Sequence, residues 1–170
     1  MHIEDILLMG LTLGLIMMAT FIQPVQNAAD NINKSAATIV NEDVVNFVDQ
    51  TRSQGYITGS DYTKLIDGIT STSNSYDIVV TLDSSKYYPT EGGGQYLNAY
   101  ETDSQAEIQE ALGTMSTGDR YDMKAGDYLY VGVKQTNISI AQRLAAIMNN
   151  MCSTPQIIVH YGGIVGNEAD

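Results

Sequence analysis

The chain of 170 residues contains a single cysteine, Cys152, no tryptophan, and only eight lysine and arginine residues. One cysteine cannot form an internal disulfide, so the core has to be stable without such a crosslink. A formal net charge of −12 argues against electrostatic binding to nucleic acid or to anionic lipid. The same charge helps to keep an exposed domain in solution.

Motifs for catalysis and for metal binding are also missing. The sequence has no H-E-x-x-H, G-x-S-x-G or C-x-x-C, and the glycines at 92–94 lack the lysine and the following helix of a phosphate-binding loop. His160 falls in an expected strand as an ordinary sheet residue. The spacing of three loop acids does not match an EF-hand, so solvated charge is preferred to a calcium site at Asp119, Asp122 and Asp127. We expect no catalytic residue, no metal and no cofactor, and a protein that is not an enzyme.

The longest apolar run extends from Ile6 to Ile22 and contains no charged residue. Its roughly 17 residues span about 26 Å as a helix, the short end of what crosses a hydrocarbon core. A core helix in so short a chain would keep a polar stripe, which this run lacks. A cleaved signal peptide would have a basic start and a small-residue cleavage site, and neither is present here. The run therefore predicts a membrane helix that is retained.

Two acids, Glu4 and Asp5, stand at the start of this run. A carboxylate at the edge of a bilayer is costly unless a positive group pairs with it. The amino group of Met1, from the same chain or from a neighbouring copy, can supply that group, and acids in a first turn also suit the helix dipole. Solvation of both acids among lipid head groups is the alternative. We expect Met1 to lie at or very near the mature N-terminus.

Beyond Pro24 the apolar residues recur at helical spacing as far as about Arg52. One helix is therefore expected from the start of the chain to about residue 52, on the order of 80 Å long. Pro24 should kink this helix rather than end it, because an interior proline removes one hydrogen bond and clashes with the preceding turn. The apolar stripe consists of Val25, Ala28, Ala29, Ile32, Ala36, Ile39, Val40, Val44, Phe47 and Val48.

This layout resembles the type IV pilin superfamily, including pseudopilins and Tad-type pilins. The resemblance lies in the acidic start, the apolar run with Gly10 and Gly14, the proline just beyond it, and an amphipathic half that leads into a small α+β domain. In that family the apolar half of the helix is held in the membrane before assembly and packs into the filament core afterwards. The resemblance implies that Asp5, with Glu4 as its competitor, meets the N-terminal amine of the adjacent subunit. It also implies that Pro24 matches the helix-kinking proline.

The resemblance covers about the first 52 residues well and the remainder only in architecture. The pattern departs from the family in two ways, since no basic leader ending in Gly precedes Met1 and no paired-cysteine loop lies near the C-terminus. The layout is also loosely similar to small anchored proteins of Tad-like or conjugation machinery in Gram-positive bacteria.

Short helices and strands are expected to alternate after residue 52. This pattern predicts an α+β fold, in which the long N-terminal helix packs on a small antiparallel sheet with short helices and buries Val40, Val44, Phe47 and Val48. The expected domains are residues 1–24 as the transmembrane or filament-core helix, 25–52 as its amphipathic continuation, and 53–170 as the globular domain. Gly55 stops the long helix, and the later elements are a helix from a Thr58 or Ser60 cap to Ile69, strands at 76–82, 127–134 and 156–161, helices at 103–112 and 138–151, a long loop or wide hairpin at 86–100, and a turn at Gly162 and Gly163.

The sequence thus predicts a structural subunit of a pilus-like filament or pseudopilus, assembled through its N-terminal hydrophobic helix. The alternative is a monomeric, membrane-anchored extracytoplasmic binding domain. Expected partners are copies of the chain itself, the membrane before assembly, and the pilus or secretion assembly machinery, with no nucleic acid. The expected location is the membrane and surface of a prokaryotic cell. The candidate assembly residues are Met1, Glu4, Asp5, Gly14 and Pro24.

Overall fold

The computed structural model describes residues 3–17, 20, 23–89, 96–102, 105–138, 143 and 156–167. The chain divides into two compact units. One unit consists of Met1–Ala36 and Ile138–Pro155, and the other, which we call the sheet unit, consists of Ala37–Asn137 and Gln156–Asp170. Residues 37–52, which the sequence assigns to the helix continuation, therefore belong to the sheet unit.

Two helices make up the described N-terminal part, α1 at Ile3–Met17 and α2 at Gln23–Gln54. Between them only Thr20 is described, so the prediction of one continuous helix stays a prediction. Pro24 is the second residue of α2, where a proline costs no hydrogen bond because the first N–H groups of a helix have no intrahelical acceptor. The kink predicted at Pro24 would fall in the stretch between α1 and α2, most of which lies outside the described residues, so it stays a prediction. Gly55 follows α2 with a φ of 82°, as expected of a helix stop.

The main sheet is antiparallel, with strand order β3-β2-β5-β6. Its strands are β2 at Tyr76–Pro89, β3 at Tyr96–Thr102, β5 at Tyr128–Gln135 and β6 at Ile158–Ile164. The first part of β2, from Tyr76 to Asp83, pairs with β5, and the part from Asp83 to Pro89 pairs with β3. The three predicted strands are confirmed, and the segment at 86–100 takes the hairpin form, with the residues between β2 and β3 outside the described part.

Shorter elements complete the sheet unit. Thr58 caps α3 (Gly59–Thr70), because its Oγ1 accepts a hydrogen bond of 3.1 Å from the backbone N–H of Asp61. The predicted helix at 103–112 corresponds to α4, Gln105–Thr114. Two three-residue strands, β1 at Tyr56–Thr58 and β4 at Arg120–Asp122, form a separate antiparallel pair that the sequence did not indicate. The predicted helix at 138–151 lies outside the described residues except for its first residue and Arg143.

The turn predicted at Gly162 and Gly163 is wrong, because both glycines lie inside β6. Gly162 pairs with Tyr130, and a Cβ added to it would stand 2.7 Å from the carbonyl oxygen of Leu129. A Cβ on Gly163 would collide with the guanidinium of Arg52. These glycines permit close approach of neighbouring groups to the strand rather than reversing the chain.

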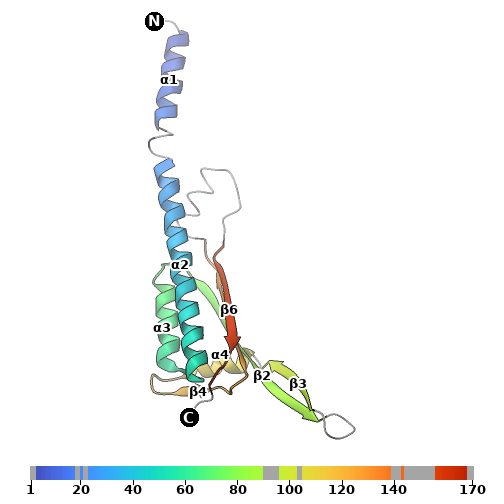
Figure 1. Ribbon diagram of the computed structural model, residues 1–170. Helices are drawn as coiled ribbons and strands as arrows, with labels where there is room; N and C mark the ends of the chain where they lie inside the picture. The colour runs from blue at the N-terminus through green and yellow to red at the C-terminus, as the bar shows by residue number, and fades with distance from the viewer. Residues whose placement is uncertain are drawn as a thin grey trace. The chain divides into compact units, whose positions relative to one another are not determined.

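The fold is α+β, as the sequence predicted, with the second half of α2 packed on the sheet (Figure 1). Polar contacts tie α2 to β6, because Arg52 Nε donates a 2.9 Å hydrogen bond to the carbonyl of Ile164, and Tyr161 Oη donates one of 3.2 Å to Asp49 Oδ1. The core contains residues of both α2 and the sheet. All four helix residues predicted to be buried are in it, together with sheet residues: Val40, Val44, Phe47, Val48, Val80, Leu82, Leu129, Val131 and Val133.

Candidate functional site

Every described residue of α1 is exposed, although the helix is almost entirely apolar. Its large apolar side chains are between 56% and 81% exposed, at Ile6 and Ile3 respectively. A helix that is apolar on every face normally lies in a protein core or in a membrane. An exposed apolar surface of this kind marks a site of contact with another molecule or with lipid. We call this surface, formed by residues 3–17, the α1 surface.

The predicted assembly residues are distributed along the two helices. Glu4 and Asp5 lie together in the first turn of α1 and are exposed. Gly14 is in the same helix, and a Cβ added to it would meet no atom within 4 Å. Pro24 is exposed in the first turn of α2. Met1 lies outside the described residues. The acids therefore share one turn, while the glycine and the proline occupy separate positions further along the chain.

The described part of α1 has 15 residues, which rise about 22 Å along the helix axis at 1.5 Å per residue. Within the described ranges, no helix combines enough length with enough apolar character to span a membrane.

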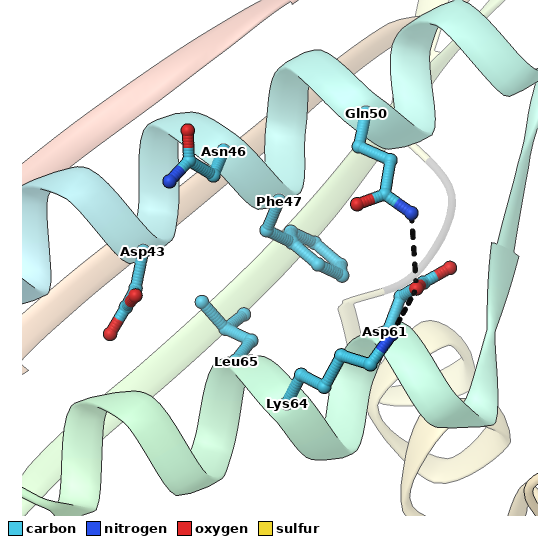
Figure 2. A pocket seen from close by; sticks show the side chains of 7 residues that line it. All are labelled: Asp43, Asn46, Phe47, Gln50, Asp61, Lys64 and Leu65. Atoms are coloured by element: carbon cyan, nitrogen blue, oxygen red, sulfur yellow. Dashed lines mark hydrogen bonds and ion pairs between the residues drawn. The ribbon is translucent and has the colours of Figure 1, made fainter.

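A second candidate site is the groove between α2 and α3 in the sheet unit (Figure 2). Its volume is about 150 Å³, below the roughly 300 to 1,000 Å³ that is usual for ligand pockets. The lining consists of carboxylates, amides, one lysine and two apolar side chains: Asp43, Asn46, Phe47, Gln50, Asp61, Lys64 and Leu65.

Asp61 is the best-connected residue of this groove. Its Oδ2 accepts a 2.7 Å hydrogen bond from Thr58 Oγ1, and its Oδ1 accepts one of 3.2 Å from Gln50 Nε2. Lys64 Nζ lies 3.7 Å from the same Oδ1 (Figure 2). Asp61 thus links the N-terminal end of α3 to α2 and completes the helix cap. These bonds occupy its carboxylate in a structural role.

Asp43 is the least satisfied residue of the groove. Its Oδ2 is buried and has no hydrogen-bond partner among the described residues. A Cβ added to Gly68 of α3 would collide with this oxygen, so the carboxylate packs directly on the glycine. Burial raises the pKa of Asp43 above its ordinary value, and the nearby charge of Glu42 raises it further. The contact brings α2 and α3 close together at the expense of an unpaired acceptor.

The groove offers little for chemistry. It contains no histidine, cysteine, serine or threonine among its lining residues. In the part of the chain that the structure covers, no group of three or more His, Cys, Asp or Glu side chains is placed to hold a metal ion. The loop acids each have local partners. Asp119 Oδ2 accepts from the N–H of Ser116, Asp122 pairs with Arg120, and Asp127 Oδ2 accepts from the N–H of Lys124.

Comparison with known proteins does not assign the chain to a family. No protein-family model, no curated protein and no solved structure matches it. Its function therefore has to be inferred from its own residues.

Proposed function

We propose that this protein is a structural subunit of a pilus-like filament or pseudopilus, and that the α1 surface drives its assembly. The observation that carries the proposal is the full exposure of α1, whose residues beyond Glu4 and Asp5 are apolar or uncharged. Such a helix is stable only when something apolar surrounds it. In this proposal lipid surrounds it before assembly, and the corresponding helices of neighbouring copies surround it afterwards.

The rest of the chain fits a structural role. The second half of α2 is held on its own sheet by Val40, Val44 and Val48, which are fully buried. Each copy would therefore bring a folded sheet unit to the filament, while the α1 surface stays available for contacts with other copies. Neither candidate site supplies a nucleophile with an adjacent base, so we propose a structural rather than an enzymatic role.

The acids of the first turn have a specific task in this proposal. A carboxylate inside an apolar filament core is costly unless it is paired, and the amine of a neighbouring N-terminus is a suitable partner. Asp5, with Glu4 in support, would pair with that amine. The pair would then set the register between subunits more than it would add net stability. The site of action would be the membrane and the outer surface of a prokaryotic cell, with the assembly machinery as a further partner.

Negative-stain electron microscopy of the surface fraction of expressing cells tests the proposal. We expect filaments that contain this chain, and we expect Asp5→Asn to slow or abolish their formation without unfolding the sheet unit. The double variant Glu4→Gln with Asp5→Asn should be worse. Asp30→Asn is the matched control, because it removes an exposed acid from α2 instead of from the first turn of α1.

Two outcomes would overturn this function. One is a wild-type protein that stays monomeric in the membrane under all expression levels. The other is a doubly neutral variant that forms filaments at the normal rate. Either result would favour a membrane-anchored binding domain instead.

A further inference from the structure

The main sheet has an outer face on β5 and β6, turned away from the core. Side chains of successive residues in a strand point to opposite faces. On β5, Leu129, Val131 and Val133 are buried in the core, so the residues between them belong to the opposite face. Directly paired residues of two strands share a face, which places the β6 partners there as well. We define the outer face as Tyr128, Tyr130, Gly132, Lys134, Ile158, His160, Gly162 and Ile164.

Tyr130 and His160 are joined across this face. Tyr130 pairs with Gly162, two residues beyond His160, so the two rings are diagonal neighbours. A hydrogen bond of 2.7 Å connects Tyr130 Oη to His160 Nδ1. The ring centroids are 5.7 Å apart and the ring planes differ by only 14°. The two rings are thus nearly parallel and are joined at their edges by this hydrogen bond, and we call the pair the plate.

Two glycines allow the rings to lie down on the strands. A Cβ added to Gly132 would stand 3.1 Å from His160 Nδ1 and 3.6 Å from Tyr130 Cε1. A Cβ added to Gly162 would stand 3.2 Å from Tyr128 Cε1. The rings therefore cover the glycine backbone with one side. Of the two plate rings, His160 is exposed and Tyr130 is half-buried, and Tyr128 on the same face of β5 is exposed.

Covering of glycine by aromatic rings stabilises strands and accounts for one side of the plate. It does not account for the apolar flanks. Ile158 is 52% exposed and Ile164 is 54% exposed on the same face, at opposite ends of β6. The outer face thus combines flat aromatic rings, aliphatic flanks and polar rim atoms in one open surface.

We propose that this plate is a binding platform for a neutral polysaccharide. Sugar rings present flat faces of C–H groups and carry hydroxyl groups around their edges. The plate offers part of that arrangement, because its ring faces are apolar and its polar atoms lie at the ring edges. Tyr130 Oη and His160 Nδ1 are bonded to each other, so His160 Nε2 is the remaining ring nitrogen for a sugar hydroxyl. Thr81, which pairs with Tyr130 from β2, places a hydroxyl group on the same face.

The negative net charge of the chain favours a neutral polymer as the ligand. Nucleic-acid bases also stack on aromatic rings, but their phosphates would be repelled by a chain with a net charge of −12. On the outer face itself Lys134 pairs in register with Asp77, so that position supplies no net positive charge. Anionic polysaccharides are disfavoured for the same reason. The platform is shallow, so each copy would bind weakly, and an array of copies would bind by avidity. Binding by a single copy does not depend on assembly.

A retention assay on insoluble polysaccharides tests the platform. The full-length chain, kept in a detergent without a sugar head group, is incubated with cellulose, chitin or starch granules, and with heparin beads as the anionic arm. We expect retention on at least one neutral polysaccharide and release by the matching soluble disaccharide. Tyr130→Ala and His160→Ala should each weaken retention at least about fivefold, by analogy with the loss of one base stacked on an aromatic side chain.

Further variants separate binding from folding. Tyr130→Phe keeps the ring but loses the hydrogen bond, so it should bind between the wild type and Tyr130→Ala. Tyr56→Ala, which removes an aromatic ring from β1, is the matched control and should bind like the wild type. Thermal unfolding of every variant shows whether the sheet unit is intact, and retention is compared only between variants with the wild-type transition.

Each of four binding results would overturn the platform. They are retention on none of the three neutral polysaccharides, retention that folded Tyr130→Ala preserves, an equal loss in Tyr56→Ala, and preferential binding to heparin. A change of oligomeric state in folded Tyr130→Ala, measured by analytical ultracentrifugation, would instead assign the outer face to contacts between copies and would also exclude the proposal.

Discussion

The α1 surface and the second half of α2 differ in the exposure of their apolar residues. In α1 every described side chain is exposed, whereas in α2 Val40, Val44 and Val48 are fully buried. Exposed positions such as Glu42 and Asp49 alternate with these valines, as in any helix that covers a sheet. Val40, Val44 and Val48 are thus covered by the chain itself, whereas the apolar side chains of the α1 surface are exposed. In the proposed function, this difference separates residues that hold the fold from residues that contact other copies.

The largest expected effect comes from placing charge on the α1 surface. Leu8→Lys combined with Leu11→Lys should abolish filament formation, because each lysine costs about 2.5 to 3.5 kcal/mol at the centre of an apolar helix in a membrane. The melting temperature of the sheet unit should not change. Electron microscopy and thermal unfolding measure the two properties, and Asn27→Lys on the exposed surface of α2 is the control. Normal filaments from the double lysine variant would contradict the role of α1.

The same substitution in the two regions sharpens the contrast. Leu129→Ala should lower the free energy of unfolding of the sheet unit by about 2 to 5 kcal/mol, because Leu129 is fully buried and its truncation leaves a cavity. Leu11→Ala should change it by less than about 0.5 kcal/mol, because Leu11 is 59% exposed. Urea denaturation of the two variants in the same detergent measures both changes in the free energy of unfolding. Equal effects would mean that α1 contributes to the core.

The sequence predicted the parts of this molecule that depend on local pattern. Alternation located β5, helical spacing identified Val40 and Val44 as core residues, and the cap at Thr58 located α3. The two short strands β1 and β4 were missed because three residues are too few to show a period. The turn assigned to the glycines of β6 was wrong because a glycine pair indicates backbone freedom or close approach equally well.

The features of the candidate sites also differ in whether a local sequence pattern indicates them. Glu4 and Asp5 were predicted as assembly residues because they border an apolar run, and their role stays a prediction. The contact of Asp43 with Gly68 depends on how two helices cross, which no local pattern records. The pairing of Tyr130 with His160 depends on strand register. The alternation of tyrosines with aliphatic residues along β5 is visible in the sequence. It indicates which residues share a face of the sheet, but it does not indicate that Tyr130 contacts His160.

Substitution of glycines in two helices of the sheet unit should have an intermediate effect on the free energy of unfolding. Gly68→Ala should destabilise the sheet unit by about 1 to 3 kcal/mol, because its Cβ would collide with the Asp43 carboxylate and force α2 and α3 apart. Gly113→Ala in α4 is the matched control. A Cβ there meets nothing within 4 Å, so this change should be neutral or should stabilise the helix by up to about 1 kcal/mol.

A double-variant cycle identifies the cause of the Gly68 effect. If the collision with Asp43 is responsible, Asp43→Ala should remove most of the cost of Gly68→Ala in urea denaturation. A cost that is unchanged in the Asp43→Ala background would place the strain elsewhere. The second half of α2 would then be held against α3 by contacts other than this carboxylate.

The smallest effect concerns pH and tests whether Asp43 weakens the half of α2 that is held on the sheet. Burial, with the charge of Glu42, raises the pKa of Asp43 above its ordinary value of 3.8. The folded state therefore binds the proton more tightly than the unfolded state, and stability falls as the pH rises from below 3.8 through the raised pKa. Asp43→Asn removes this loss because the amide does not ionise. Its melting temperature should exceed that of the wild type at pH 7, and the difference should shrink as the pH falls through the same window. Asp30→Asn, an exchange at an exposed position, should change the melting temperature little at any pH. A variant that is less stable than the wild type at neutral pH, or one whose advantage grows on acidification, would show that the carboxylate of Asp43 supports the contact between α2 and α3 in its charged form.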